Sequence, residues 1–165
     1  MWKDILLNSI IKDLRVIKRL SGKIPLDQMN FRPKENVRST EELLKYLSFT
    51  VTAPIDFWLN SPAEDFRSHF GKLNEASKNI APEAYPAIFE QQIEAIHLLF
   101  EKISESDLLN KEVTLPSGTP SKLGEAILET SVKWLSAYKM QLFLYIKIST
   151  DHQLTTPDLW RKVED

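Results

Sequence analysis

The chain has 165 residues, 42% of them hydrophobic and 27% charged, with a formal net charge of −2 and no cysteine. The lack of cysteine excludes disulfides, thiolate metal sites and cysteine nucleophiles, and the balanced charge argues against nucleic-acid binding, which needs a dense basic patch. We therefore expect a single domain over residues 1–165, with a core of ordinary size and no nucleic-acid partner.

The N-terminal stretch MWKDILLNSIIKDLRVIKRL contains acidic residues and lacks a clean apolar segment. It therefore indicates an amphipathic helix and not a signal peptide. The sequence also has no run of about 18 apolar residues, the length that a membrane-spanning helix needs. Together with the absence of cysteine, these features favour a cytoplasmic protein without a membrane partner.

The first predicted helix runs from Trp2 to Leu20, and Ser21 and Gly22 end it. Its apolar residues recur every three or four positions, as in an amphipathic helix. They are Ile5, Leu6, Ile10, Leu14, Ile17 and Leu20. A link with two prolines, residues 23–38, follows and is expected to pack on one end of the helices.

A second helix is predicted to begin at Ser39 or Thr40, which are good N-cap residues followed by two glutamates. Pro54 lies inside its pattern and should kink the helix or divide it in two. The inner face is Leu43, Leu44, Leu47, Val51 and Ile55. Residues 60–72, which are polar and contain a proline, are predicted to form a loop.

The third helix begins in the stretch APEAYP, from Ala81, and residues 104–118 then connect it to the fourth. Within this connection KEVTLP favours a short extended piece. The fourth helix is expected from Thr119 to about Ser149, and the tail carries a short turn ending at Trp160. The inner stripe of the fourth helix is expected to be Leu123, Ile127, Ser131, Trp134, Tyr138, Gln141 or Leu142, and Tyr145. Four long helices in one chain predict an all-α four-helix bundle with long connections.

Three stretches resemble the DinB/YfiT-like superfamily, a group of bacterial four-helix bundles that often hold a divalent metal. They are FRPKENVRSTEELLKYL, GTPSKLGEAILETSVKWLSAYKMQLFLYIK and TTPDLW, in the order and spacing of that family. The resemblance covers almost the whole chain. The family pattern implies one metal-ligating histidine in the second helix and two in the last, and these positions hold Tyr46, Trp134 and Tyr138 here.

All three expected metal ligands are therefore absent. A neutral imidazole binds transition metals, whereas the indole nitrogen of Trp134 only donates a hydrogen bond. Two phenols and an indole do not make a zinc or nickel site, so we predict no metal and no cofactor. Residues four apart on one helix still point in a common direction, and Trp134 and Tyr138 are expected to fill or line the volume of the missing site.

The remaining candidates for chemistry are isolated. His69 is expected in a polar loop and His152 in the tail, both in water. Glu94 and His97 form one Glu-x-x-His, half of a di-iron motif, and are interpreted as a surface pair. Two carboxylates on the fourth helix, Glu125 and Glu129, are expected on a solvated face, and no serine has a histidine placed to activate it. No catalytic residue is assigned.

Six residues of the second and fourth helices could line a pocket for a small organic molecule or could simply form an aromatic core. They are Tyr46, Thr50, Trp134, Tyr138, Gln141 and Tyr145. Two nearby lysines, Lys45 and Lys139, are expected to face water.

Two functions stay open. The first is a metal-free binding or interaction module. The resemblance suggests a homodimer, for which Trp2, Phe57 and Trp58 could supply an interface. The alternative is an enzyme of the DinB family, a thiol-dependent transferase or isomerase with an atypical or absent metal site.

Overall fold

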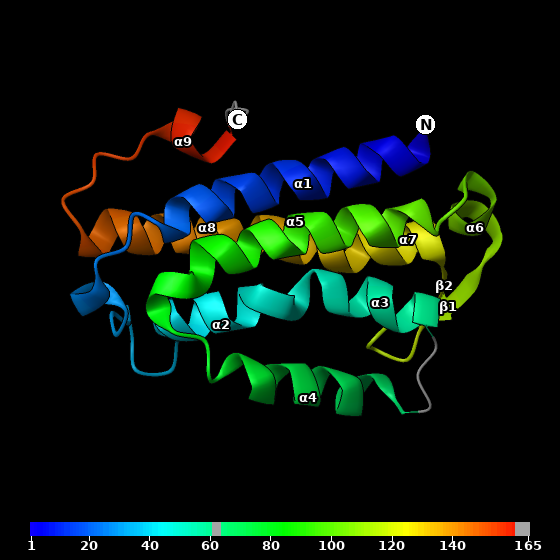
Figure 1. Ribbon diagram of the computed structural model, residues 1–165, viewed down its shortest axis with the longest axis horizontal. Helices are drawn as coiled ribbons and strands as arrows, with labels where there is room; N and C mark the ends of the chain where they lie inside the picture. Colours follow the sequence, from blue (N-terminus) through cyan, green and yellow to red (C-terminus); the bar gives the residue numbers. More distant parts are fainter. Residues whose placement is uncertain (61–63, 161–165) are drawn as a thin grey trace.

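A computed structural model describes residues 1–60 and 64–160 (Figure 1). These residues are mostly helical, which confirms the predicted all-α class. Two parts of the predictions, residues 61–63 of the expected loop and residues 161–165 of the expected domain, lie outside the described residues. None of the helices in the described ranges is both long and apolar enough to cross a membrane.

The longest helical segments pack side by side around one core (Figure 1). They are α1 (Trp2–Ser21), α2 (Thr40–Thr50) with α3 (Thr52–Asn60), α5 (Tyr85–Glu101) and α8 (Lys133–Ser149). Helix α1 contacts α5 and α8 along its length, and α2 contacts both of them as well. The apolar stripe predicted for α1 is buried except at Ile5, which is 57% exposed. Ile5 lies outside the buried arc because consecutive helix positions are separated by about 100°.

The second predicted helix is divided as its sequence indicated. Ser39 caps α2, since its hydroxyl accepts from the Glu42 N–H at 3.2 Å while the Glu42 carboxylate accepts from the Ser39 N–H at 2.8 Å. The helix breaks at Val51, and α3 carries the chain on through Pro54. Proline has no N–H, so the carbonyl four residues earlier has no helical partner and the helix bends. All five predicted inner residues are fully buried.

Helix α4 (Phe66–Ser77) occupies part of the predicted loop, so that prediction was wrong. The Asp65 side chain caps it by accepting from the Ser68 N–H at 3.0 Å. Phe66, Phe70 and Leu73 then fall on one side at helical spacing. This face packs against α2 and α3, and α4 lies along them as an additional helix (Figure 1).

A small hairpin stands between α5 and the last long helix. It follows α6 (Glu105–Asn110) and pairs β1 (Glu112–Thr114) with β2 (Pro120–Lys122) in an antiparallel register that sets Val113 opposite Ser121. The extended piece predicted for KEVTLP is thereby confirmed. The predicted helix start at Thr119 was wrong, because residues 120–122 form β2 and α7 (Leu123–Ile127) begins only after it.

Trp58 was expected at a subunit interface, but it is buried inside the molecule. Its side chain is 4% exposed, and the indole N–H donates to the Thr114 carbonyl in β1 at 3.0 Å. Phe57 is half-buried against the Phe66 ring of α4. These two aromatics therefore hold α3 to the hairpin and to α4. The remaining short helices are η1 (Leu26–Gln28), η2 (Pro82–Ala84) and α9 (Thr156–Trp160).

A π-helical segment, η3 (Leu128–Val132), joins α7 to α8. A π turn holds one more residue than an α turn. The inward face beyond it is therefore displaced by one position, from the predicted Trp134 and Tyr138 to Leu135 and Lys139, which are fully buried. Trp134 and Tyr138 are half-buried on the neighbouring side of the helix.

Candidate functional site

The structure brings together two of the three positions where the resemblance implies metal ligands. The rings of Tyr46 on α2 and Tyr138 on α8 meet edge to face, with centroids 5.1 Å apart and planes at 71°. Trp134 lies one turn before Tyr138 on the same side of α8 and is half-buried. Two residues of the predicted pocket, one on each of these helices, are therefore in contact.

The positively charged side chain of Arg38 lies against these two rings. The guanidinium carbon of Arg38 is 4.2 Å from the centre of the Tyr46 ring and 5.7 Å from the centre of the Tyr138 ring. Arg38 is otherwise exposed and directly precedes the cap of α2. Such cation–π contacts are worth about 0.5–1 kcal/mol at an exposed site. Arg38 was not predicted as a site residue, although it lies within the FRPKENVRSTEELLKYL stretch.

Further aromatic rings continue the cluster away from α8. Phe70 of α4 lies 5.9 Å from Tyr46 and 4.9 Å from Phe49, and Phe66 lies 5.5 Å from Phe70, between ring centroids. Helix α4 therefore contacts the tyrosine pair through Tyr46. We call these rings, Tyr46, Phe49, Phe66, Phe70 and Tyr138, the aromatic cluster.

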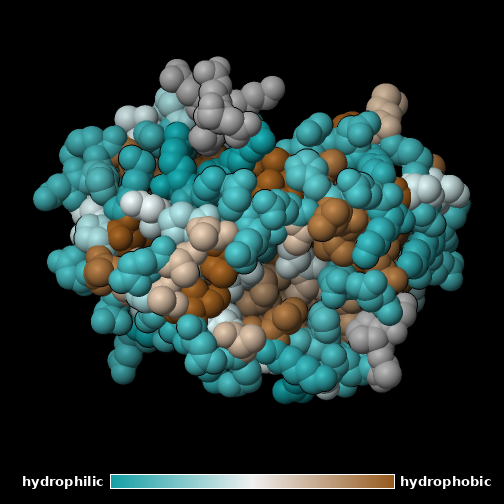
Figure 2. All heavy atoms as spheres, in the orientation of Figure 1, coloured by the Kyte–Doolittle hydropathy of each residue, from teal (hydrophilic) through white to brown (hydrophobic). Residues whose placement is uncertain are grey.

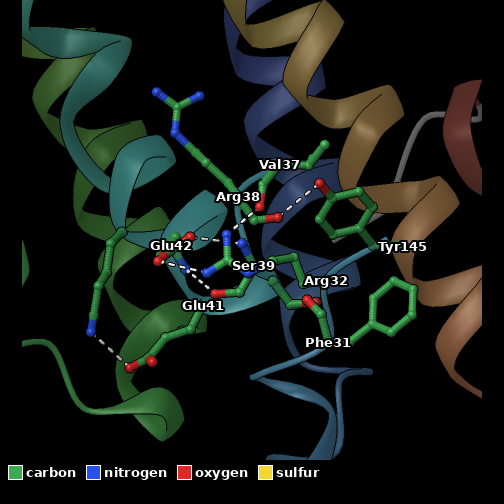
Figure 3. Close-up of polar contacts among 10 residues, drawn as sticks. Phe31, Arg32, Val37, Arg38, Ser39, Glu41, Glu42 and Tyr145 are labelled. Atoms are coloured by element: carbon green, nitrogen blue, oxygen red, sulfur yellow. Dashed lines mark hydrogen bonds and ion pairs between the residues drawn. The ribbon is translucent and has the colours of Figure 1, made fainter. Parts of the chain in front are cut away.

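Gln141 and Tyr145 form hydrogen bonds outside the contact between Tyr46 and Tyr138. The Gln141 amide donates to the Tyr145 hydroxyl at 2.6 Å, and this hydroxyl donates to the Arg38 carbonyl at 2.9 Å. Figure 3 shows the Tyr145 hydroxyl directed at the backbone that leads into α2, with the Tyr145 ring beside Phe31. These contacts tie the segment of residues 31–39 to α8. The six predicted pocket residues therefore include two that anchor this segment.

An ion pair strengthens the same segment. The Arg32 guanidinium donates to the Glu42 carboxylate at 2.9 Å and also to the Val37 carbonyl (Figure 3). The hydrogen bond from Arg32, together with the Ser39 N–H, holds the pKa of Glu42 below its usual range. The same carboxylate completes the capping box of α2.

Burial raises the pKa of the Tyr46 phenol, and the nearby Thr50 hydroxyl acts in the opposite direction. Thr50 is fully buried within α2. A phenol with a raised pKa stays protonated at neutral pH.

Lys139 was expected to face water, and this was wrong. Its side chain is 0% exposed, and its ammonium donates to the Asp13 carboxylate of α1 at 2.6 Å. The Trp160 ring of α9 covers the ammonium at 4.1 Å. The π segment turns Lys139 inward, and a buried charge is tolerated only when it is paired. Lys45 is half-buried and pairs with Glu41 at 2.8 Å.

The histidines lie apart from the aromatic cluster's tyrosine pair. His69 was expected in a solvated loop, but it lies on α4, 3.5 Å from a Glu64 oxygen and 3.8 Å from an Asp56 oxygen. Its side chain is only 15% exposed because α4 packs it against Phe57. Glu94 and His97 are exposed on α5, as expected for a surface pair. His152, Glu125 and Glu129 are exposed too, as predicted.

The donor atoms at the ligand positions do not fit a divalent metal. Two phenols and an indole offer no imidazole, thiolate or carboxylate, and a guanidinium lies against the rings. Within residues 1–60 and 64–160, no three histidine, aspartate or glutamate side chains are grouped so that they could hold a metal ion. The arrangement is that of an aromatic contact surface between α2, α4 and α8.

Comparison of the sequence with models of known protein families gave no match, and comparison with curated proteins gave none either.

Proposed function

We propose that this protein is a DinB/YfiT-like four-helix bundle that has lost the family metal centre and acts as a non-catalytic small-molecule-binding or interaction module. The observation that carries this proposal is the contact between Tyr46 and Tyr138, at two positions where the resemblance implies metal-binding histidines. In this view the four bundle helices are α1, α2 with α3, α5, and α7 with α8. Helix α4 is an addition that contributes Phe66 and Phe70 to the aromatic cluster.

Electrostatics support the loss of the metal. The Arg38 guanidinium occupies the face of the Tyr46 ring at 4.2 Å. A divalent cation bound between α2 and α8 would meet this like charge and would find only phenol oxygens as ligands. The guanidinium therefore favours the aromatic arrangement over metal binding.

The test is the metal content of tag-free protein after incubation with zinc, nickel, iron and manganese and desalting. We expect no stoichiometric metal by mass spectrometry. A matched variant restores the implied ligands with Tyr46→His, Trp134→His and Tyr138→His and should bind one divalent ion per chain. Stoichiometric metal in the natural sequence would overturn the proposal and favour the alternative, a thiol-dependent transferase or isomerase. A folded triple variant without metal would show that the ligand positions were assigned wrongly.

The proposal includes a homodimer, and one end of the molecule offers a surface for it. A hollow of about 190 Å³ there is lined by Leu6, Leu108 and Gly124, and the 52% exposed Trp2 stands at its edge. Lys122 and Glu125 also border it. A two-fold interface must be complementary to itself. This surface holds the exposed Trp2 ring beside a hollow, and it carries charges of both signs. It is therefore complementary in shape and in charge to the same surface of a second copy of the chain.

A further inference from the structure

Two adjoining hollows lie between α4 and α5, over the break that separates α2 from α3. Their volumes are about 320 and 310 Å³, and Thr52, Leu73 and Ala95 line both of them. Figure 2 shows apolar side chains gathered in a depression on this face, between the places where α5 and α4 run in Figure 1. We call this continuous depression the α4–α5 groove. None of the six residues in the predicted pocket lines it.

The first hollow of the groove has an uncharged lining. Its apolar part consists of Phe49, Leu73, Ala76, Ile80, Ile88 and Ala95. Its polar part includes three hydroxyls, on Ser48, Thr52 and Ser77, each of which donates to the backbone carbonyl three residues earlier in the chain, at 2.7 to 3.2 Å. The protons of these hydroxyls are used within the helices, so they offer only lone pairs to a molecule in the groove.

Gln92 adds a hydrogen-bond acceptor without a donor to the lining of the first hollow. Its side chain is 5% exposed, and its amide nitrogen donates to the Leu47 carbonyl at 3.0 Å. A carbonyl only accepts, so the nitrogen must face Leu47 and the amide oxygen must face away from it. That oxygen, Oε1, is buried and has no hydrogen-bond partner among the described residues. Leaving such an acceptor without a donor costs about 1–3 kcal/mol.

We propose that the α4–α5 groove binds a neutral, elongated aliphatic molecule that carries one hydrogen-bond donor. The donor satisfies Gln92 Oε1, and the aliphatic body lies along Leu73 and Ala95 from the first hollow toward the second, which Leu98 and Leu99 line together with the charged Asp56 and Lys102. An uncharged lining at the first hollow disfavours a charged head group, because a charge would lose its hydration there without gaining a partner. This inference deepens the proposed binding function and rests on it for the role of the molecule, but it uses other residues.

The test compares two isomers that differ in one donor. 1-Heptanol has a hydroxyl proton, whereas hexyl methyl ether has the same atoms and no donor. Titrating each into the ¹⁵N-labelled full chain, we expect saturable amide shifts at Leu73, Gln92 and Ala95 with the alcohol. The ether should bind about five- to tenfold more weakly, as the loss of one hydrogen bond implies. In Gln92→Met this difference between the two probes should vanish.

A second pair of variants keeps the test decisive if Gln92→Met does not fold. Ala95→Phe places a ring in the groove and should abolish the shifts. His97→Phe introduces the same ring at an exposed position of α5 and should leave binding unchanged. Equal binding of alcohol and ether, binding that survives in Ala95→Phe, or shifts elsewhere on the molecule would each overturn the inference. A metal-free chain that ignores heptanol would refute only this site, whereas a metal-loaded chain would refute the proposed function.

Discussion

The buried pair of Lys139 and Asp13 is a residue-scale feature with a measurable cost. Both charges leave water on folding, and each is tolerated because the other lies 2.6 Å away. Lys139→Met leaves the Asp13 carboxylate without a partner and should lower the free energy of unfolding by about 3–5 kcal/mol. Adding Asp13→Leu should restore most of this loss, since an apolar pair of similar volume often replaces a buried ion pair without cost.

Urea unfolding of the two single variants and the double variant at pH 7 gives the coupling between Lys139 and Asp13 directly. Exposed Lys133, which pairs with Glu129 on the surface of α8, is the control. Lys133→Met should change the free energy of unfolding by less than about 1 kcal/mol. A double variant that is as unstable as the sum of the singles would contradict the argument.

Tyr85 gives a prediction about pH. It is fully buried, its hydroxyl finds no hydrogen-bond partner in the described part of the chain, and burial raises its pKa. The unfolded tyrosine loses its proton near pH 10 while the folded one keeps it. The Tyr85 contribution to stability is therefore fully present below about pH 10 and is lost as the pH rises further. In Tyr85→Phe part of this alkaline loss should disappear.

The measurement is the free energy of unfolding of Tyr85→Phe at pH 7 and at about pH 10.5. At pH 7 this variant should be unchanged or up to about 1 kcal/mol more stable, because it removes a hydroxyl that has no partner. Tyr145→Phe is the matched control, since its hydroxyl bonds both Gln141 and Arg38. It should be about 1–2 kcal/mol less stable at pH 7. The reverse order of these two variants would show that Tyr85 has a donor or acceptor nearby.

At the scale of elements, the break between α2 and α3 and the π segment support each other. The Ser131 hydroxyl of η3 donates to the Val51 carbonyl at 2.8 Å, and both residues are fully buried. Val51 lies where the helix is interrupted before Pro54, so its carbonyl benefits from a donor outside the helix. The two irregular segments therefore meet through one hydrogen bond.

Removing this hydrogen bond tests the coupling. Ser131→Ala should lower the free energy of unfolding by about 1–2 kcal/mol, because the Val51 carbonyl loses its buried donor. Ser136→Ala, on the half-buried side of α8 one turn later, should change it by less than about 0.5 kcal/mol. Thermal and urea unfolding of both variants provide the comparison. Equal effects would mean that Ser131 only fills space.

Helical periodicity allowed most elements to be predicted, and its exceptions have physical reasons. The break near Pro54 followed from the missing N–H, and the cap at Ser39 from its hydroxyl and Glu42. Helix α4 was missed because the polar composition outweighed the spacing of Phe66, Phe70 and Leu73. The π segment has no local signature, yet one inserted residue moved Lys139 from the expected surface into the core. Partners of buried charges come from distant helices and cannot be inferred from local spacing.

The only part of the candidate site that could be predicted was the part formed by residues of the second and fourth predicted helices. Tyr46 and Tyr138 were both predicted to lie between these helices, in a pocket or in an aromatic core, but the placement of Arg38 over the Tyr46 ring depends on the path of a connection. The α4–α5 groove could not be predicted at all, because one of its walls is the helix that was expected to be a loop. Gln92 was not singled out, since a glutamine that follows another glutamine in a helix gives no sign that its oxygen lacks a partner.

At the scale of the whole molecule, the proposed dimer depends on the end surface around Trp2. We expect light scattering to give the mass of a dimer at about 100 µM, and Trp2→Ser to give the mass of a monomer, because the exposed indole supplies much of the apolar contact. Leu26→Ser changes a 59% exposed apolar residue in η1 and should leave the dimer intact. A natural chain that stays monomeric at this concentration would refute the dimer.

The position of Trp160 over Lys139 has a consequence for chemical labelling. Arg19 of α1 donates to the Asp158 carbonyl and helps to hold α9 in place, and the Trp160 ring lies 4.1 Å from the Lys139 ammonium. A reagent that acetylates amines can therefore reach Lys139 only after α9 lifts away, whereas exposed lysines react at once. The rate at which Lys139 is acetylated consequently measures how often the C-terminal segment opens while the rest of the molecule stays folded.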